Sequence, residues 1–188
     1  MLKKIIVLLT VAAVLTGFVA AQDPTSKFSV VATGNLLFPS DSGYTDTYSS
    51  ARFYPEIRLA FALGKGFFLY AGYGLLSASG TTPGLGVDAS STQHIFSLGG
   101  GIGGPLTGKL SYKLGLGIFL DAYKETALDT EVTGSGIGFR ADAGLCYGLS
   151  PKLSAQLGLG FLSGSDDVEG MSIKLGGFRL GACLGYKF

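Results

Sequence analysis

His94 is the only histidine of the chain, so any chemistry that needs an imidazole acid or base must use it. Ser97 follows three residues later, and a serine nucleophile must lie within hydrogen-bond distance of its base. The segment around them, 92–103, alternates as a β-strand does, so this odd spacing places the two side chains on opposite faces. The sequence has no Cys/His metal spacing, phosphate-binding loop or nucleophile elbow either. We therefore predict no catalytic residue, cofactor or metal, and no enzymatic activity.

Two cysteines, Cys146 and Cys183, raise the question of a disulfide, because an even cysteine count in a secreted chain suggests pairing. They fall on two predicted strands with a third strand between them. Next-but-one strands lie about 10 Å apart, whereas a disulfide needs Cα atoms within about 4.4–6.8 Å. We predict two buried free thiols.

Charged residues also recur at period two inside otherwise apolar segments. Side chains at that period share one face of a strand, and the large apolar residues then occupy the other face. Buried charges are costly unless they are paired, so we expect these residues to pair with one another in a polar network. The candidate network consists of Arg52, Glu56, Arg58, Lys113, Asp121, Arg140, Asp142 and Arg179.

Eight strands are needed to position these residues. The alternation predicts strands at about 27–38, 51–63, 67–79, 92–103, 109–124, 135–149 and 152–162, and a last strand that reaches 188. Long polar segments (39–50, 80–91, 125–134 and 163–170) follow the odd strands, and short turns (64–66, 104–108 and 150–151) follow the even ones. Ile173 and Leu175 are out of phase with the apolar residues after them, which predicts a β-bulge at Gly176 and Gly177.

The last strand ends on an aromatic residue after a run of alternating apolar side chains. Its apolar face includes Phe178, Leu180, Leu184, Tyr186 and Phe188, opposite Arg179, Gly181, Cys183, Gly185 and Lys187. This strand resembles the closing strand of small bacterial outer-membrane β-barrel proteins, in which such a sequence is read by the barrel assembly machinery. The resemblance implies an eight-stranded antiparallel up-and-down transmembrane barrel, inserted as a monomer among outer-membrane lipids, with short periplasmic turns and longer external loops.

Composition supports a membrane location. Only 14% of the residues are charged, against about 25% in soluble domains. A soluble eight-stranded barrel of the lipocalin kind would point its apolar face inward and leave too few charges to cover its outside. We therefore expect the polar face to line a narrow lumen that side chains fill.

The first 21 residues have the pattern of a secretory signal peptide. Lys3 and Lys4 precede an apolar run, and the small residues Ala20 and Ala21 precede the expected cleavage site. The predicted organisation is a signal peptide at 1–21 and a barrel domain at 22–188.

The four long segments are acidic and contain no lysine or arginine, whereas Lys65, Lys109 and Lys152 lie in or beside the short turns. Such a face argues against nucleic-acid binding, which needs basic patches. The acidic run at 166–169 lacks a calcium-loop spacing, so we interpret it as solvated charge. We expect a structural or surface-interaction role with a closed lumen. Two alternatives remain open: a lipid A-modifying enzyme that uses His94, and a narrow channel or carrier.

Overall fold

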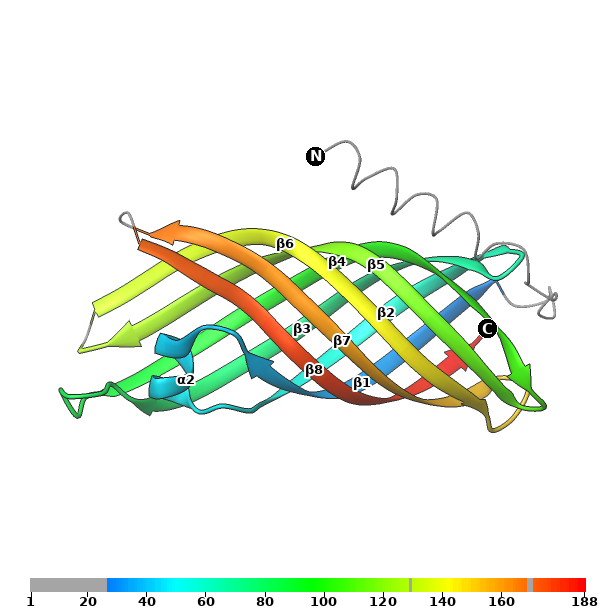
Figure 1. Cartoon of the computed structure of the whole chain (residues 1–188), viewed down its shortest axis with the longest axis horizontal. Coiled ribbons are helices and arrows are strands. Elements are labelled where there is room, and N and C mark those ends of the chain that lie inside the picture. The colour runs from blue at the N-terminus through cyan, green and yellow to red at the C-terminus, as the bar shows by residue number, and fades with distance from the viewer. Residues whose placement is uncertain (1–26, 129, 169–170) are drawn as a thin grey trace.

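Period-two alternation runs through eight segments of the chain, and each of them forms a strand (Figure 1). The structure is a computed structural model that describes residues 27–128, 130–168 and 171–188. The strands are β1 (Phe28–Pro39), β2 (Arg52–Gly64), β3 (Phe67–Thr81), β4 (Asp88–Thr107), β5 (Leu110–Ala127), β6 (Thr130–Gly148), β7 (Leu153–Val168) and β8 (Met171–Lys187). Each strand pairs antiparallel with the next, and β8 pairs with β1, so the barrel is closed. The predicted strand number and topology are confirmed. The predicted signal peptide lies outside the described residues.

Large apolar side chains cover the outside of the barrel. On β2, Phe53, Ile57 and Leu59 are 63%, 57% and 45% exposed, while Tyr54 and Glu56 between them are buried. Water would not favour so much exposed apolar surface, but the hydrocarbon of a bilayer matches it. The alternative of a soluble barrel with its apolar face inward is therefore wrong.

The strands are longer at one end of the barrel than the sequence predicted. A tilted strand needs about 9–11 residues to cross a bilayer, yet β4 has 20 residues and β6 has 19. Strands β5 and β6 stay paired out to Ala127 and Thr130, and β7 and β8 out to Val168 and Met171. Segments predicted as long loops are therefore mostly continued hairpins, because antiparallel pairing can proceed in water beyond the bilayer. We call this the outer end.

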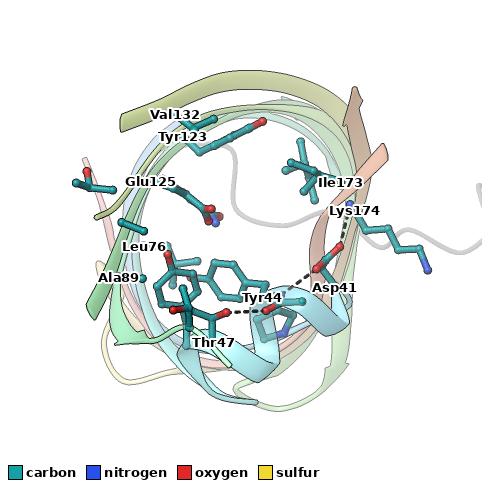
Figure 2. Close-up of a pocket in the computed structure, with 18 of the residues that line it drawn as sticks. Asp41, Tyr44, Thr47, Leu76, Ala89, Tyr123, Glu125, Val132, Ile173 and Lys174 are labelled. Carbon is teal, nitrogen blue, oxygen red and sulfur yellow. Dashed lines mark hydrogen bonds between the residues drawn. The ribbon is translucent and has the colours of Figure 1, made fainter. Parts of the chain in front are cut away.

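A short helix, α2 (Ser42–Tyr48), lies at the outer end between β1 and β2 and was not predicted from the sequence. Asp41 caps it, because its carboxylate accepts a hydrogen bond from the Tyr44 backbone N–H at 2.9 Å. The same carboxylate accepts the Lys174 N–H of β8 at 3.3 Å, which fixes the helix to the barrel wall (Figure 2). Among the described residues, no helix is long and apolar enough to cross a bilayer.

The predicted β-bulge in the last strand is wrong. Pairing between β7 and β8 runs without a shift from Leu153 and Tyr186 to Val168 and Met171. The positive φ angles of Gly176 (93°) and Gly177 (153°) distort the backbone but leave this register intact. Leu175 therefore faces the lumen on the same side of β8 as Arg179, instead of facing lipid.

Both cysteines are free and buried, as predicted. Gln156 of β7 is the register partner of Cys146 on one side and of Cys183 on the other. The Cys146 thiol donates a hydrogen bond to the Gln156 side-chain oxygen at 3.3 Å. The strand between the cysteines thus keeps them apart.

Candidate functional site

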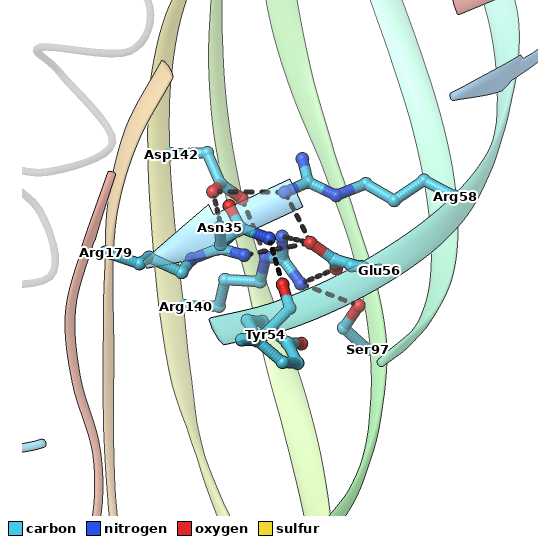
Figure 3. A network of polar contacts seen from close by, with 8 residues as sticks. All are labelled: Asn35, Tyr54, Glu56, Arg58, Ser97, Arg140, Asp142 and Arg179. Carbon is cyan, nitrogen blue, oxygen red and sulfur yellow. Dashed lines mark hydrogen bonds and ion pairs between the residues drawn. The ribbon is translucent and has the colours of Figure 1, made fainter. Parts of the chain in front are cut away.

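Five of the eight charged residues predicted to form a network lie together in the middle of the lumen (Figure 3). We call this group the ion cluster; it consists of Glu56 and Arg58 from β2, Arg140 and Asp142 from β6, and Arg179 from β8. Inward-facing positions on three strands spaced around the ring bring these side chains to one level. The cluster therefore links opposite sides of the barrel across the lumen.

Glu56 is the centre of the ion cluster. Its carboxylate accepts hydrogen bonds from both terminal nitrogens of Arg140, with an Nη2–Oε2 distance of 3.0 Å, and it also accepts Arg179 at 2.9 Å and Arg58 at 2.8 Å. The Glu56 and Arg140 side chains are both fully buried. One carboxylate thus compensates three guanidinium groups, and charge-assisted bonds of this kind are the strong ones.

Asp142 completes the ion cluster on its other side. It accepts a hydrogen bond from Arg140 Nε at 2.7 Å and another from Arg179, and its carboxylate lies 3.6 Å from Arg58. Three arginines thus face two carboxylates. The Tyr70 ring lies beside the excess positive charge, with its centroid 5.5 Å from the Arg140 guanidinium carbon and 5.7 Å from that of Arg58.

Glycine makes room for the ion cluster within the lumen. A Cβ atom added to Gly160 of β7 would lie 2.8 Å from Arg179 Nε and 2.8 Å from Asp142 Oδ1. Any side chain at this position would displace an ion pair. Some of the many glycines of the sequence are therefore explained by crowding inside a narrow barrel.

The other three predicted network residues lie outside the ion cluster. Arg52 is near the outer end and donates to the Ser79 carbonyl at 3.0 Å. Lys113 is nearer the short turns, with its ammonium nitrogen 5.9 Å from the centre of the Phe68 ring. Asp121 is fully buried, and neither of its carboxylate oxygens has a hydrogen-bond partner among the described residues.

An apolar layer lies next to the ion cluster on its outer side. It consists of Leu37, Tyr54, Leu76, Ile95, Phe119, Tyr123, Leu162 and Leu175. The inward-facing positions show the order: along β7, Gly160 touches the ion cluster and Leu162 lies two residues further out. Leu162 and Tyr54 are fully buried. Asp121 projects from β5 between Phe119 and Tyr123, which both belong to this layer.

Small voids lie beside the ion cluster. Two small voids of about 40 and 20 Å³ lie there, and Arg58 and Asp142 line both. Such volumes suit isolated water molecules that bridge polar groups. The ion cluster and the apolar layer are thus two adjacent layers of side chains within the barrel.

A cavity of about 350 Å³ lies at the outer end of the barrel, and we call it the vestibule (Figure 2). Leu37, Leu76 and Leu175 of the apolar layer lie at its floor, and Tyr44 and Tyr48 of α2 lie along one side. Desolvation by burial raises the pKa of Tyr44 to about 12, so its hydroxyl stays neutral at physiological pH.

His94 and Ser97 lie on opposite faces of the barrel wall. The His94 ring faces outward, where its Nδ1 is 2.9 Å from the Tyr73 hydroxyl. Ser97 is buried in the lumen, and its hydroxyl accepts a hydrogen bond from Arg140 at 2.9 Å. The pair cannot form a nucleophile and base in this arrangement. His94, Tyr73 and Phe96 instead form part of an aromatic group on the outer surface.

The residues of the C-terminal signal also face outward. The side chains of Phe178, Leu180, Leu184 and Tyr186 are 43–58% exposed, and Phe188 is 63% exposed. The Phe188 ring packs near Phe28, with ring centroids 6.1 Å apart, at the seam where β8 meets β1. The described end of β1 and the C-terminus therefore lie at the same end of the barrel (Figure 1).

The apolar layer and the α2 helix were missed at the sequence level, although both have a signal. Three large apolar residues, Ile95, Phe119 and Leu162, stand out on the polar face of their strands. The residues two positions before and two positions after each of them are polar or glycine. The recurrence of such apolar residues near the outer ends of several strands marks the layer. Asp41, followed by Ser42 and Gly43, is a helix N-cap signal within a segment that was read as loop.

Solved structures with the same fold include small outer-membrane barrels. The chain matches outer membrane protein OprG from Pseudomonas aeruginosa with a TM-score of 0.68 and 11% identity, covering 87% of this chain and 96% of that one. It matches Neisserial surface protein A with a TM-score of 0.65 and 15% identity, over 86% and 97% of the two chains. It matches Ail, the attachment invasion locus protein of Yersinia pestis solved with the heparin analogue sucrose octasulfate, with a TM-score of 0.54 and 11% identity, over 87% and 97%.

No protein-family model matches the chain, and no curated protein sequence does. At the identities found, the structural neighbours establish the fold. The resemblance of the last strand to small eight-stranded outer-membrane barrels is confirmed at that level. Together with the exposed apolar surface, the fold indicates a bacterial outer-membrane location.

Proposed function

We propose that this eight-stranded barrel of the bacterial outer membrane has a structural and surface-interaction role, with a lumen closed to solutes and no enzymatic activity. The observation that carries the proposal is the pair of filled cross-sections, the ion cluster and the apolar layer. A solute that crossed the barrel would have to separate the Glu56 and Arg140 pair and also displace Leu162 and Phe119. Eight strands leave an interior just wide enough for side chains to fill.

The contact surface in this proposal is the outer end of the barrel. The hairpins β3–β4, β5–β6 and β7–β8 extend there beyond the length a bilayer needs, and α2 lies among them (Figure 1). This end is rich in carboxylates, including Asp46, Asp88 and Glu131. The polyanion in the Ail structure is therefore a poor model for a ligand here, and a cationic or neutral partner fits better.

Planar-bilayer recording tests the closed lumen. Refolded protein should insert without producing steady conductance steps, and the Glu56→Ala/Leu162→Ala double variant should conduct small ions because both layers are weakened. Each single variant keeps one layer and should remain silent. Steady conductance of the unmodified protein would overturn the closed-lumen proposal in favour of a channel.

The alternative of a lipid A-modifying enzyme depends on His94, the only imidazole of the chain. Its outward position against Tyr73 supports a role at the membrane surface instead. We expect a His94→Ala variant expressed in cells to leave the lipid A profile unchanged by mass spectrometry. A change that requires the unmodified protein and is lost in this variant would establish the enzyme.

We also propose that the chain inserts as a monomer and that its last strand is the signal read by the barrel assembly machinery. The support is the exposed aromatic Phe188 at the end of a strand that closes the ring against β1. Deleting Phe188 should slow assembly into vesicles that contain the machinery, while spontaneous refolding in detergent continues. Equal slowing of both would instead indicate a structural role for the residue.

A further inference from the structure

The vestibule is a cavity that the closed-lumen proposal does not use. Its volume of about 350 Å³ is more than twice that of an engineered cavity of about 150 Å³ that binds benzene. Small-molecule sites are typically concave and mostly apolar, with a few polar groups directed inward. The vestibule matches that description, because leucines form its floor and tyrosines lie along its walls.

Glu125 is the charged side chain that points into the vestibule (Figure 2). Its carboxylate forms no ion pair within the part of the chain that the structure describes. Lys174 also lines the cavity, but its ammonium group points away from it. The Asp41 carboxylate is occupied by the backbone N–H groups of Tyr44 and Lys174. Among the described residues, Glu125 is therefore the lining carboxylate that has neither a partner cation nor bound backbone N–H groups.

Aromatic rings surround this carboxylate. Tyr44, Tyr48 and Tyr123 come from α2 and β5 and line the same cavity, and the rings of Tyr44 and Tyr48 pack with centroids 4.7 Å apart. The Tyr44 hydroxyl itself is buried, so Tyr44 contributes its ring and not its hydroxyl to the cavity wall. Tyrosine faces attract cations, and the attraction grows when water is excluded.

A second carboxylate without a partner lies one inward-facing layer below. Asp121 is separated from Glu125 along β5 by Tyr123 alone among the inward-facing residues, and both its oxygens are buried and unpartnered. Arg52, a cation of this region, is engaged by the Ser79 carbonyl and does not line the cavity. The vestibule and the layer beneath it thus each contain a carboxyl group without a partner cation.

We propose that the vestibule binds a small organic cation, an amine or quaternary ammonium with an apolar alkyl or aromatic body. Glu125 would pair with the cationic group, Tyr44 and Tyr48 would face it, and Leu76 and Leu175 would contact the apolar body. Acidic residues at the outer end favour the approach of cations from outside the cell. The apolar layer stops the ligand from passing further, so the site is a receptor-like pocket and not a channel entrance.

The test uses 2-phenylethylammonium as the probe and 2-phenylethanol as its neutral analogue. Both are titrated by isothermal calorimetry into the refolded protein in a zwitterionic detergent at neutral pH, with protein-free micelles as the blank. We expect saturable binding of the cation about tenfold tighter than that of the alcohol. No saturable binding of the cation, or equal binding of the two compounds, would overturn the proposal.

Variants locate the site. Glu125→Gln should weaken binding of the cation about tenfold and leave the alcohol unchanged, since the amide keeps the shape and removes the charge. Glu131→Gln is the matched control, because Glu131 is at the same end of the barrel, is ion-paired with Lys124 at 2.6 Å and does not line the cavity. Equal effects of the two variants would indicate general surface electrostatics and contradict the site.

A second variant keeps the test valid if Glu125→Gln does not refold, as judged by heat-modifiability on a gel. Tyr44→Leu removes an aromatic face and a hydroxyl while keeping an apolar contact. This variant should weaken binding of the cation more than binding of the alcohol. Tyr44→Phe should retain most of the affinity. Affinity for the cation that is unchanged in Tyr44→Leu would contradict the aromatic part of the site. The outcome is independent of bilayer conductance, so failure here leaves the closed-lumen proposal standing.

Discussion

The ion cluster and the apolar layer fill adjacent cross-sections of the same tube by opposite means. In the ion cluster, Glu56 compensates three arginines, and any one partner that is lost leaves buried charge behind. In the apolar layer, Leu162 and Phe119 fill space without polar groups, and a loss leaves a cavity. The comparison teaches that two adjacent layers of one narrow barrel can be held by different forces, electrostatic pairing and packing, and that the two layers should respond differently to substitution.

The largest effect is expected from removing the centre of the ion cluster. Glu56→Ala leaves three guanidinium groups with only Asp142, so the free energy of unfolding should fall by about 3–5 kcal/mol. Urea unfolding of the refolded barrel, followed by circular dichroism, measures the change. Glu131→Ala removes an exposed ion pair with Lys124 and should cost only about 0.2–1 kcal/mol. Similar costs for the two variants would contradict the central role of Glu56.

A large loss of stability is also expected from a substitution in the apolar layer. Leu162→Ala should lower the free energy of unfolding by about 2–5 kcal/mol, because a fully buried side chain is replaced by a cavity. The control is Leu159→Ala on the same strand, whose side chain is 53% exposed toward lipid. The same unfolding assay compares them. If Leu159→Ala lowers the free energy of unfolding as much as Leu162→Ala does, contact with lipid contributes as much to stability as packing in the lumen, which would contradict this prediction.

Crowding within the ion cluster predicts a smaller effect. Gly160→Ala places a methyl group 2.8 Å from Arg179 Nε, and overpacking of this kind costs about 1–3 kcal/mol. Gly115→Ala is a matched control, because its added Cβ would lie 3.7 Å from the Asp142 Cβ, an ordinary contact. The difference between their urea midpoints measures the effect. A destabilised Gly115→Ala with a normal Gly160→Ala would reverse the assignment of the tight position.

The smallest expected change is an increase in stability, from a substitution of Asp121. Asp121 places a carboxylate without hydrogen-bond partners among the side chains of the apolar layer. Asp121→Asn keeps the shape and removes the charge, so the free energy of unfolding should rise by about 1 kcal/mol at neutral pH. Asp142→Asn, which removes a charge from within the ion cluster, should lower it. A loss of stability in Asp121→Asn would mean that the carboxylate has a stabilising partner.

Much of the fold could be predicted because alternation and strand number are local properties of the chain. The even-numbered apolar face of the last strand, from Phe178 to Phe188, specified which side of β8 meets lipid. The charges of the ion cluster were predicted as candidates because they alternate with large apolar residues and so share the polar face of their strands. Which of them meet depends on their level along the barrel axis, and Arg52, Lys113 and Asp121 lie at other levels than the ion cluster.

The sequence by itself thus determined the outside of the barrel, since exposure to lipid imposes one requirement on every second residue. Only the tertiary structure decided how the inside is filled. Leu175 looked like an outward residue displaced by a bulge, but β8 stays in register with β7, and Leu175 points inward into the apolar layer. The level at which a side chain meets its partner across the lumen depends on strand tilt and stagger, which belong to the closed ring and to no single strand.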